Sequence, residues 1–445
     1  MVRTYDVIVI GTGPAGGIAA RGLNKDGLEV AVADHRPFGG TCPLRGCEPK
    51  KVMVDLADTV TRFHGQEGHG LSGDIRIDWH DLMSFKESFT EPVPGSVEKS
   101  FEKSGVDTYH GKARFTGEKS VAVGDEELRA EKIVIAAGAE PRKLDIPGEE
   151  HILLSSDFLN LKELPGRIVF IGGGYISFEF AYVAAVAGAK PLILHRSGQP
   201  LKGFDHELAN MLVDGLCTRG LEVVTDAPVT AVEKANGGYK VHAGGKQYDA
   251  DLVVHGAGRV PATSDLDLQS AGVKTGGGGV SVNEFMQSVS NPAVYAAGDV
   301  VEVGQPLTPV ANMEAEIVVH NILNGNERKT DYTGVPSALF TCPPLASTGI
   351  SEAEAKKSGV KYERFFGKSD GWPEHQRLGE TGTGYKVLYD PSCGCILGAH
   401  ILGHNSTEIV NVFGMAMRLG KTIDDLKDMV WSYPSYIYTI RYMIT

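Results

Sequence analysis

The apolar residues of this chain gather in short, nearly continuous runs, which is the pattern of strands buried on both faces of a sheet. Two of these runs, residues 5–10 and 167–171, lead directly into clusters of glycine. A helical pattern follows each cluster, at residues 18–24 and 178–187. This order of strand, glycine-rich turn and helix is typical of dinucleotide-binding folds. Because it occurs twice, the sequence predicts two such folds in one chain.

The other regions predict a mixed α/β protein with a distinct C-terminal part. From about residue 333 the pattern changes to strands and turns, and a helix is expected at residues 407–419. A chain of 445 residues is too long for one hydrophobic core and predicts about three domains. Earlier in the chain we expect helices at 52–63 and 79–103, and strands at 29–33, 106–109, 120–123, 132–135 and 191–194.

Composition and charge exclude several classes of protein. The net charge of −13 argues against a nucleic acid or an anionic membrane as partner, and no apolar run is long enough to span a bilayer. Six cysteines in a chain of this length fit a reducing compartment. No signal peptide is expected, because the first strand and glycine turn begin within the first dozen residues. We therefore predict a cytoplasmic location.

The first glycine cluster contains Gly11, Gly13 and Gly16. Glycines at these positions permit a tight turn and let the backbone approach a pyrophosphate held at the N-terminus of the next helix. The following strand ends in Asp34, at the distance where an acid binds the ribose hydroxyls. The first fold therefore has the parts of a complete dinucleotide site.

Two cysteines, Cys42 and Cys47, follow this fold and stand five positions apart. In a straight helix five residues rise about 7.5 Å, beyond the roughly 7 Å limit between bridged Cα atoms. A disulfide here needs a distorted turn, for which Pro43, Gly46 and Pro49 are suitable. Such a bond would be easily reduced, as catalytic disulfides are. For the two cysteines alone, a chance pair of buried free thiols is the competing interpretation.

The stretch GGTCPLRGCEPKKVM resembles the redox motif of the flavin-dependent pyridine nucleotide-disulfide oxidoreductases, which include glutathione reductase, dihydrolipoamide dehydrogenase and mercuric reductase. The resemblance implies that Cys47 contacts the flavin and that Cys42 attacks the substrate disulfide. It also implies a lysine near the flavin, for which Lys50 and Lys51 both have a suitable spacing. Arg45 replaces the small residue usual in this motif, and the sequence assigns it no role.

Further segments resemble the family's flavin-binding motifs. Residues 110–113 are similar to its adenine-contacting segment, and residues 293–300 are similar to its second flavin motif. Residues 132–141 resemble the segment at which the family's chain passes from the flavin domain to the nicotinamide domain. A helix N-terminus beginning near residue 307 would favour negative charge on the reduced ring. The implied FAD contacts are Gly11, Gly13, Pro14, Ala15, Gly16, Asp34, Gly40, Thr41, Cys42, Cys47, Lys50, Lys51, Lys112, Ala113, Ala137, Gly138, Asp299, Leu307, Thr308 and Pro309.

The second glycine cluster predicts the nicotinamide site. The strand that follows, at residues 191–194, is not followed by an acid before Asp205. Instead, Arg196 and Lys202 match the basic positions of NADPH-using glutathione reductases. An acid would repel a 2′-phosphate, whereas arginine binds one with two donors. By the same resemblance, Tyr175 is a lid over the flavin and Glu179 pairs with the flavin-side lysine. The implied NADPH contacts are Gly172, Gly174, Tyr175, Ile176, Glu179, Arg196, Lys202 and Gly258.

The C-terminus departs from the family pattern. Where the family has a His-Pro dipeptide and a glutamate five residues after the histidine, this chain has Tyr433-Pro434 and Tyr438. A histidine exchanges protons at neutral pH far better than a tyrosine does. Two interpretations of Tyr433 remain: a proton donor to the Cys42 thiolate, or a packed aromatic side chain.

These inferences predict an α/β chain of two Rossmann-like folds, for FAD and NAD(P)H, and an α+β dimerisation domain. The expected function is transfer of electrons from NADPH through FAD and the Cys42–Cys47 disulfide to a small thiol disulfide, in a homodimer without a bound metal. The alternatives are direct reduction of a quinone, metal ion or oxygen at the flavin, a dihydrolipoamide dehydrogenase-like reaction, and a redox-controlled protein partner. Cys217, Cys342, Cys393 and Cys395 are predicted to be non-catalytic. The expected domains are 1–147 (FAD, first part), 148–262 (NAD(P)H), 263–332 (return to the FAD and central region) and 333–445 (dimerisation).

Overall fold

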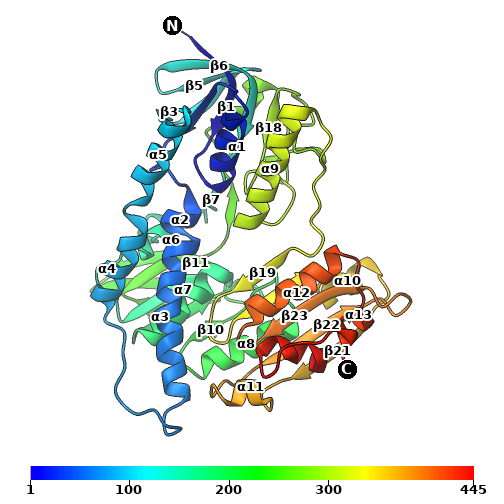
Figure 1. The fold of residues 1–445 in the computed structure, drawn as a ribbon. Helices are drawn as coiled ribbons and strands as arrows, with labels where there is room; N and C mark the ends of the chain where they lie inside the picture. The colour runs from blue at the N-terminus through cyan, green and yellow to red at the C-terminus, as the bar shows by residue number, and fades with distance from the viewer. Residues whose placement is uncertain (1) are drawn as a thin grey trace. The chain divides into compact units, whose positions relative to one another are not determined.

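The computed structural model describes residues 2–445, which divide into two compact units (Figure 1). Each unit is assembled from segments that are far apart in the sequence. Among the described residues, no helix is both long and apolar enough to cross a membrane. The first unit contains Met1–Pro49, Phe85–Arg142 and Arg259–Tyr332, and the second contains Lys50–Ser84, Lys143–Gly258 and Thr333–Thr445.

A seven-stranded sheet forms the centre of the first unit. Its order is β3-β2-β1-β6-β5-β4, with β18 also paired to β6. Strands β3, β2, β1, β6 and β18 are parallel, and β2, β18 and the ends of β1 and β6 have the nearly continuous apolar sequences expected of such strands. The bounds are β1 (Arg3–Ile10), β2 (Val30–Asp34), β3 (Asp107–His110), β4 (Ala113–Gly117), β5 (Ser120–Val123), β6 (Glu126–Ile135) and β18 (Val294–Ala296).

Helices α1 and α9 pack against each other beside this sheet, as Figure 1 shows. Gly22 of α1 provides the room for this contact, because a Cβ there would lie 3.0 Å from a methyl group of Val319. The apolar faces of both helices join the strand side chains in one core. The remaining elements are α1 (Pro14–Lys25), α9 (Thr308–Asn324), β7 (Ala139–Pro141), β15 (Arg259–Pro261), η2 (Leu268–Ala271), β16 (Thr275–Gly276) and β17 (Gly279–Val280).

The second unit contains the second dinucleotide fold. Its parallel sheet has the order β10-β9-β8-β14, and a separate antiparallel sheet has the order β11-β12-β13. The bounds are η1 (Glu149–His151), α6 (Ser155–Phe158), β8 (Arg167–Ile171), α7 (Tyr175–Val186), β9 (Lys190–Leu194), α8 (His206–Cys217), β10 (Glu222–Val224), β11 (Val229–Ala235), β12 (Gly238–Ala243), β13 (Lys246–Ala250) and β14 (Leu252–His255).

A five-stranded antiparallel sheet, with the order β19-β20-β23-β22-β21, dominates the C-terminal part of the second unit. Helix α12 covers it and agrees within a residue with the helix predicted at 407–419. The bounds are β19 (Pro336–Leu339), β20 (Leu345–Gly349), α10 (Glu352–Ser358), β21 (Glu363–Lys368), α11 (Pro373–Gln376), β22 (Gly384–Tyr389), β23 (Ile396–Leu402), α12 (Ser406–Arg418), α13 (Ile423–Asp428), η3 (Tyr436–Thr439) and α14 (Ile440–Met443).

The fold class predicted from the sequence is confirmed, with one wrong element. The single helix expected at residues 79–103 is two helices, α4 (Trp79–Thr90) and α5 (Val93–Ser104). Pro92 separates them, because proline lacks a backbone donor and disfavours helical geometry in the residue before it. The division of the chain into four domain segments stays a prediction.

Candidate functional site

The first glycine loop joins β1 to α1 and is closed by Asp34 at the end of β2. The Asp34 carboxylate accepts hydrogen bonds from the Thr12 backbone N–H (2.9 Å) and hydroxyl (2.7 Å) on one oxygen. Its other oxygen accepts from the Arg36 N–H at 3.0 Å. Gly11 has a φ of +108°, and a Cβ on it would collide with the Ala136 carbonyl. The loop therefore requires glycine, as the motif predicts.

The N-terminus of α1 has the features of an anion site. Gly13 is its N-cap, with no side chain bonded to the first turn, and Pro14 begins the helix. A Cβ on Gly40 would overlap the backbone of Gly13, so the two glycines pack backbone to backbone. Unsatisfied N–H groups in a first helical turn bind phosphate groups. These residues fit the pyrophosphate of a bound dinucleotide.

Arg36, Arg45 and Arg259 add positive charge to the first unit. Arg45 is half-buried, and burial lowers its pKa, with Arg36 and Arg259 lowering it further and Asp34 opposing them. Its Nε atom is buried and has no hydrogen-bond partner among the described residues. Arg45 had no predicted role, and an orphaned guanidinium nitrogen near Asp34 suits an anionic ligand.

The two redox cysteines lie on consecutive helices. Cys42 is in α2 (Thr41–Arg45), Cys47 begins α3 (Cys47–Gly65), and Gly46 breaks the helical path between them with φ −142° and ψ −111°. Neither cysteine is in a disulfide in the described structure; Cys42 is half-buried and Cys47 is exposed. A hydrogen bond to Cys47 and burial raise the pKa of Cys42. The distorted turn that a pair at this spacing requires is therefore present.

Thr308, the first residue of α9, faces the cysteine pair. Its hydroxyl lies 3.5 Å from the Cys47 sulfur and also lowers the pKa of Cys42. Leu307 is the N-cap without a side-chain bond, and Pro309 lies in the first turn. The positive end of the α9 dipole thus faces the thiols, where it favours a thiolate.

Two carboxyl groups, the half-buried Asp299 and the buried Glu314, accompany the second flavin motif. Burial raises the pKa of Asp299 and raises the pKa of Glu314 to about 7. Glu314, on α9, accepts a 2.7 Å hydrogen bond from the Gly298 N–H and a 2.8 Å bond from the Tyr332 hydroxyl. The sequence prediction missed Glu314, because an acid within an apolar helix gives no distinct pattern. Its role in the structure is to hold the turn that carries Asp299.

The second glycine loop repeats the first in the other unit. Gly172 has a φ of +106°, and a Cβ on it would lie 2.5 Å from the Gly256 carbonyl oxygen. Gly174 is the N-cap of α7 without a side-chain bond. Ser177, at the third position of the motif, is fully buried with its hydroxyl beside Gly256. The α7 terminus therefore also fits a pyrophosphate.

His195 closes this second loop in the place that Asp34 occupies in the first. Its Nδ1 accepts a 3.0 Å hydrogen bond from the Gly173 N–H, and the separation of 22 residues equals that between Thr12 and Asp34. Its Nε2 lies 3.0 Å from the Gln199 carbonyl. Burial lowers the pKa of His195, so the neutral form is favoured. The loop is held without negative charge, a role that the sequence prediction missed.

The two basic residues after β9 that the sequence assigned to NADPH differ in exposure from the next acid. Arg196 and Lys202 are exposed and available to a phosphate. Asp205, the next acid in the chain, is buried and caps α8 by accepting from the Glu207 and Leu208 N–H groups. Its other oxygen accepts from Lys386 at 2.8 Å. No carboxylate of this segment is therefore directed to a ribose.

Lys50 and Lys51 have different partners. The Lys50 ammonium lies 2.9 Å from Glu179 and 4.2 Å from the centre of the Phe340 ring. Glu179 also accepts from the Phe340 N–H at 2.9 Å, and burial raises its pKa while Lys50 opposes that shift. Lys51 instead pairs with Asp55 on the surface of α3. The structure thus brings Lys50, rather than Lys51, to Glu179.

The predicted aromatic residues of the site are exposed. Tyr175 begins α7 and is 48% exposed, while Tyr433 is 70% exposed. The Tyr433 ring makes an edge contact with Tyr438, with 4.9 Å between the ring centres. Tyr433 is therefore a surface side chain, not part of the described core.

The remaining cysteines have three different environments. Cys342 is buried, and burial raises its pKa to about 12. Cys217 is an exposed free thiol. Cys393 and Cys395 are joined in a disulfide, which the sequence prediction missed. The structure describes no group of three or more potential metal ligands among residues 2–445.

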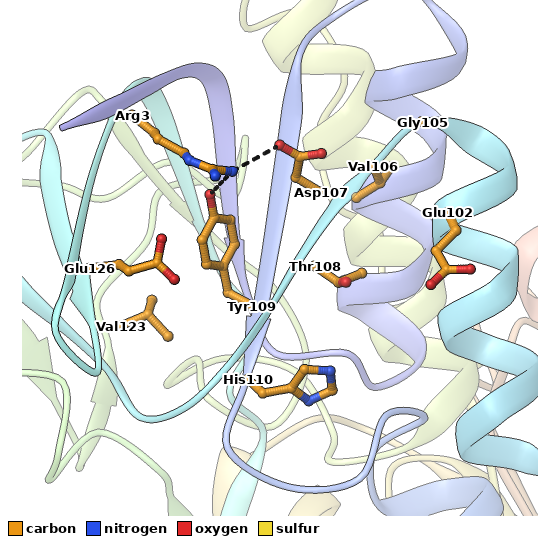
Figure 2. Close-up of a pocket in the computed structure, with 10 residues that line it drawn as sticks. All are labelled: Arg3, Glu102, Gly105, Val106, Asp107, Thr108, Tyr109, His110, Val123 and Glu126. Carbon is orange, nitrogen blue, oxygen red and sulfur yellow. Dashed lines mark hydrogen bonds and ion pairs between the residues drawn. The ribbon is translucent and has the colours of Figure 1, made fainter. Parts of the chain in front are cut away.

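A cavity of about 570 Å³ lies along β3, the edge strand of the first unit (Figure 2). Arg3 points toward Tyr109 and Asp107 across it, with 3.2 Å from its guanidinium to the Tyr109 hydroxyl. None of the predicted catalytic residues borders this cavity. Its lining is Arg3, Glu102, Gly105, Val106, Asp107, Thr108, Tyr109, His110, Val123 and Glu126.

Two dinucleotide loops and a hydrogen-bonded pair of thiols at a helix N-terminus define a nucleotide-dependent oxidoreductase of the dithiol type. The chain belongs to the pyridine nucleotide-disulphide oxidoreductase family, which it matches over residues 5–315. Residues 335–443 match the dimerisation domain of that family. The chain is a flavin-dependent NAD(P)H disulfide oxidoreductase, and its cofactors are FAD and NADPH.

Several known proteins are similar over nearly the whole chain. A glutathione reductase of Nostoc is 30% identical, with 98% of each chain covered. A trypanothione reductase of Trypanosoma congolense is 34% identical, covering 98% of this chain and 94% of its own. The Cu(II) complex of RclA, an HOCl-induced flavoprotein disulfide reductase from Escherichia coli, superposes with a TM-score of 0.90 at 28% identity. That alignment covers 100% of this chain and 99% of RclA. The predicted family is confirmed.

Proposed function

We propose that this protein reduces a small thiol disulfide with electrons from NADPH, using Cys42 and Cys47 as the relay. The observation that carries the proposal is the contact of both thiols with each other and with Thr308 at the N-terminus of α9. Bound FAD supplies the transfer of an electron pair from NADPH to the disulfide. The overall balance is NADPH, a proton and one disulfide giving NADP⁺ and two thiols.

The environment of the two thiols supports a division of roles. Cys47 faces the α9 terminus, which favours its thiolate after reduction. Cys42 is the thiol whose pKa is raised by the bond to Cys47 and by burial, which favours its protonated form in the reduced pair. Cys42 therefore needs a base before it attacks the outer disulfide, forming a mixed disulfide that Cys47 then resolves.

Tyr433 is the proposed proton-exchanging group for the released substrate thiol. It stands where the related enzymes have histidine, and its hydroxyl is exposed. We further propose that the enzyme is a homodimer, which the match to the dimerisation domain supports, and that it works in the cytoplasm, as its sparse cysteines suggest.

NADPH oxidation with a panel of disulfides tests the proposal. The panel contains oxidised glutathione, other low-molecular-weight disulfides and lipoamide, each assayed with the wild type and Cys42→Ser. We expect turnover of at least one disulfide, and loss of that turnover in the variant while FAD stays bound. Equal disulfide turnover by Cys42→Ser would contradict the relay.

A second candidate function is direct reduction of a metal ion or quinone at the flavin. It is favoured by Tyr433 in place of a histidine and by similarity to a disulfide reductase solved as a Cu(II) complex. Turnover of Cu(II) or a quinone that survives Cys42→Ser, without turnover of any disulfide, would support this second function.

A further inference from the structure

The Cys393–Cys395 disulfide lies in the turn between β22 and β23. Cys393 and Cys395 are both exposed, are separated by two positions, and have Cα atoms 5.3 Å apart. That Cα distance is within the range of bridged cysteines. Exposed disulfides are the ones that exchange with external thiols, whereas buried structural ones resist reduction.

Hydrogen bonds hold this turn independently of the sulfur–sulfur bond. The Asp390 carboxylate accepts from the Ser392 N–H at 2.8 Å and from its hydroxyl at 2.6 Å. The Asp390 N–H donates a hydrogen bond to the Cys395 carbonyl, and the Asp390 carbonyl accepts one from the Gly394 N–H. The Ile423 N–H donates to the Gly394 carbonyl at 2.9 Å and ties the turn to α13. The two thiols would therefore stay within reach of each other after reduction.

The two sulfur atoms are not equivalent. The Cys395 N–H donates a hydrogen bond of 3.3 Å to the sulfur of Cys393. A donated hydrogen bond stabilises a thiolate, and the sulfur that better stabilises negative charge is the better leaving group. An incoming thiolate should therefore attack Cys395 and release Cys393.

We propose that Cys393 and Cys395 form a second thiol–disulfide exchange site, for low-molecular-weight thiols and disulfides. A thiolate attacks Cys395, a mixed disulfide forms, and the Cys393–Cys395 bond breaks with Cys393 leaving as thiolate. A second small thiolate then attacks the sulfur of the small molecule in this mixed disulfide. The small disulfide and the Cys395 thiolate are released, and both cysteine thiolates take protons from water. Two thiols are oxidised and one protein disulfide is reduced; an excess of small disulfide drives the reverse reaction.

Equilibration of the full-length holoenzyme with glutathione mixtures, without NADPH, tests this exchange. The protein is incubated in a series of buffers whose ratio of reduced to oxidised glutathione runs from purely reduced to purely oxidised. Free thiols are then alkylated, and the mass of the peptide containing residues 393–395 is measured by mass spectrometry. We expect a change from the disulfide to the doubly alkylated form within the series. A disulfide that persists in reduced glutathione alone, or a dithiol that persists in oxidised glutathione, would overturn the proposal.

Single substitutions test the assigned order. Cys393→Ser removes the resolving thiol, so oxidised glutathione should leave a stable adduct on Cys395. Wild-type protein should show little of that adduct. Cys217 is the internal reference, because it is an exposed cysteine that forms no disulfide in the described structure. An adduct on Cys395 no greater than that on Cys217 would contradict the proposal. Because these measurements use neither NADPH nor a flavin signal, they are independent of the proposed enzymatic function.

Discussion

The Gly173 N–H donates to Nδ1 of His195, so a neutral ring performs in the nicotinamide fold the task that a carboxylate performs in the flavin fold. In the flavin fold the Thr12 N–H donates to Asp34 across the same 22 residues. The two loops therefore have the same hydrogen bond but a different charge at its acceptor. We infer that this difference would let the second fold accept a 2′-phosphate while keeping its glycine loop in place.

Substitution of His195 tests this explanation of cofactor preference. His195→Glu would keep an acceptor for Gly173 but place negative charge near the phosphate. We expect kcat/KM for NADPH to fall about 10-fold, equivalent to about 1.4 kcal/mol, with little change for NADH. His195→Gln is the matched control, because it supplies an uncharged acceptor and should retain the preference for NADPH. An unchanged NADPH/NADH ratio in His195→Glu would contradict the explanation.

Lys50 and Lys51 form a matched pair for testing the buried ion pair with Glu179. Lys50→Met leaves Glu179 as an unpaired carboxylate that is 3% exposed. Loss of one partner from a buried pair is expected to lower the free energy of unfolding by about 3 kcal/mol. Lys51→Met removes an exposed partner of Asp55 and a distant contact of 5.6 Å to the Phe340 ring centre, and should change the free energy of unfolding by less than about 0.5 kcal/mol. Denaturant unfolding of both variants measures the difference, and equal effects would refute the assignment. The double variant Lys50→Met/Glu179→Gln should regain part of the free energy of unfolding lost in Lys50→Met, because it no longer buries an unpaired carboxylate.

Glu314 should make the stability of the first unit depend on pH. Its pKa in the folded protein is raised to about 7 from an ordinary value of 4.5. The folded state therefore binds the proton more tightly, and the resulting stabilisation is complete below about pH 4.5 and lost as the pH rises through 7. The full change corresponds to about 3 kcal/mol. Glu314→Gln, which cannot ionise, should flatten this part of the stability profile, measured by unfolding between pH 4.5 and 8. If the stability of Glu314→Gln depended on pH as steeply as that of the wild type, the raised pKa of Glu314 would be contradicted.

Lys386 should be essential to the stability of the second unit. It is 1% exposed and bonds to Asp205 at 2.8 Å and to Glu352 at 2.9 Å. Lys386→Met would remove a cationic partner from the buried Asp205 and one of the partners of Glu352, which keeps Arg364 and Lys356, and this loss is expected to cost about 3 kcal/mol. Lys356→Met is the control, because Lys356 is an exposed partner of the same Glu352. Thermal unfolding of the two variants compares them, and similar midpoints would show that the buried cluster adds little stability.

The glycine loops were predictable because their backbone requirements restrict the residue type. Gly11 and Gly172 have positive φ and no room for a Cβ, so the sequence itself shows where the turns lie. His195 and Glu314 were not predictable, because each acts through a few hydrogen bonds that have no repeated sequence pattern. The bond between Cys393 and Cys395 was also missed, since two cysteines in a turn indicate proximity but not oxidation. The break at Pro92 was missed because apolar periodicity continues across it.

The central claim is that electrons from NADPH reach the Cys42–Cys47 pair through FAD. Anaerobic titration of the holoenzyme with NADPH tests it most directly, with the visible absorption spectrum recorded after each addition. We predict a long-wavelength band that arises from the Cys47 thiolate beside the flavin and is absent in Cys47→Ser. A band that persists in Cys47→Ser would contradict the assignment, and bleaching of the wild-type flavin without any such band would contradict the relay itself.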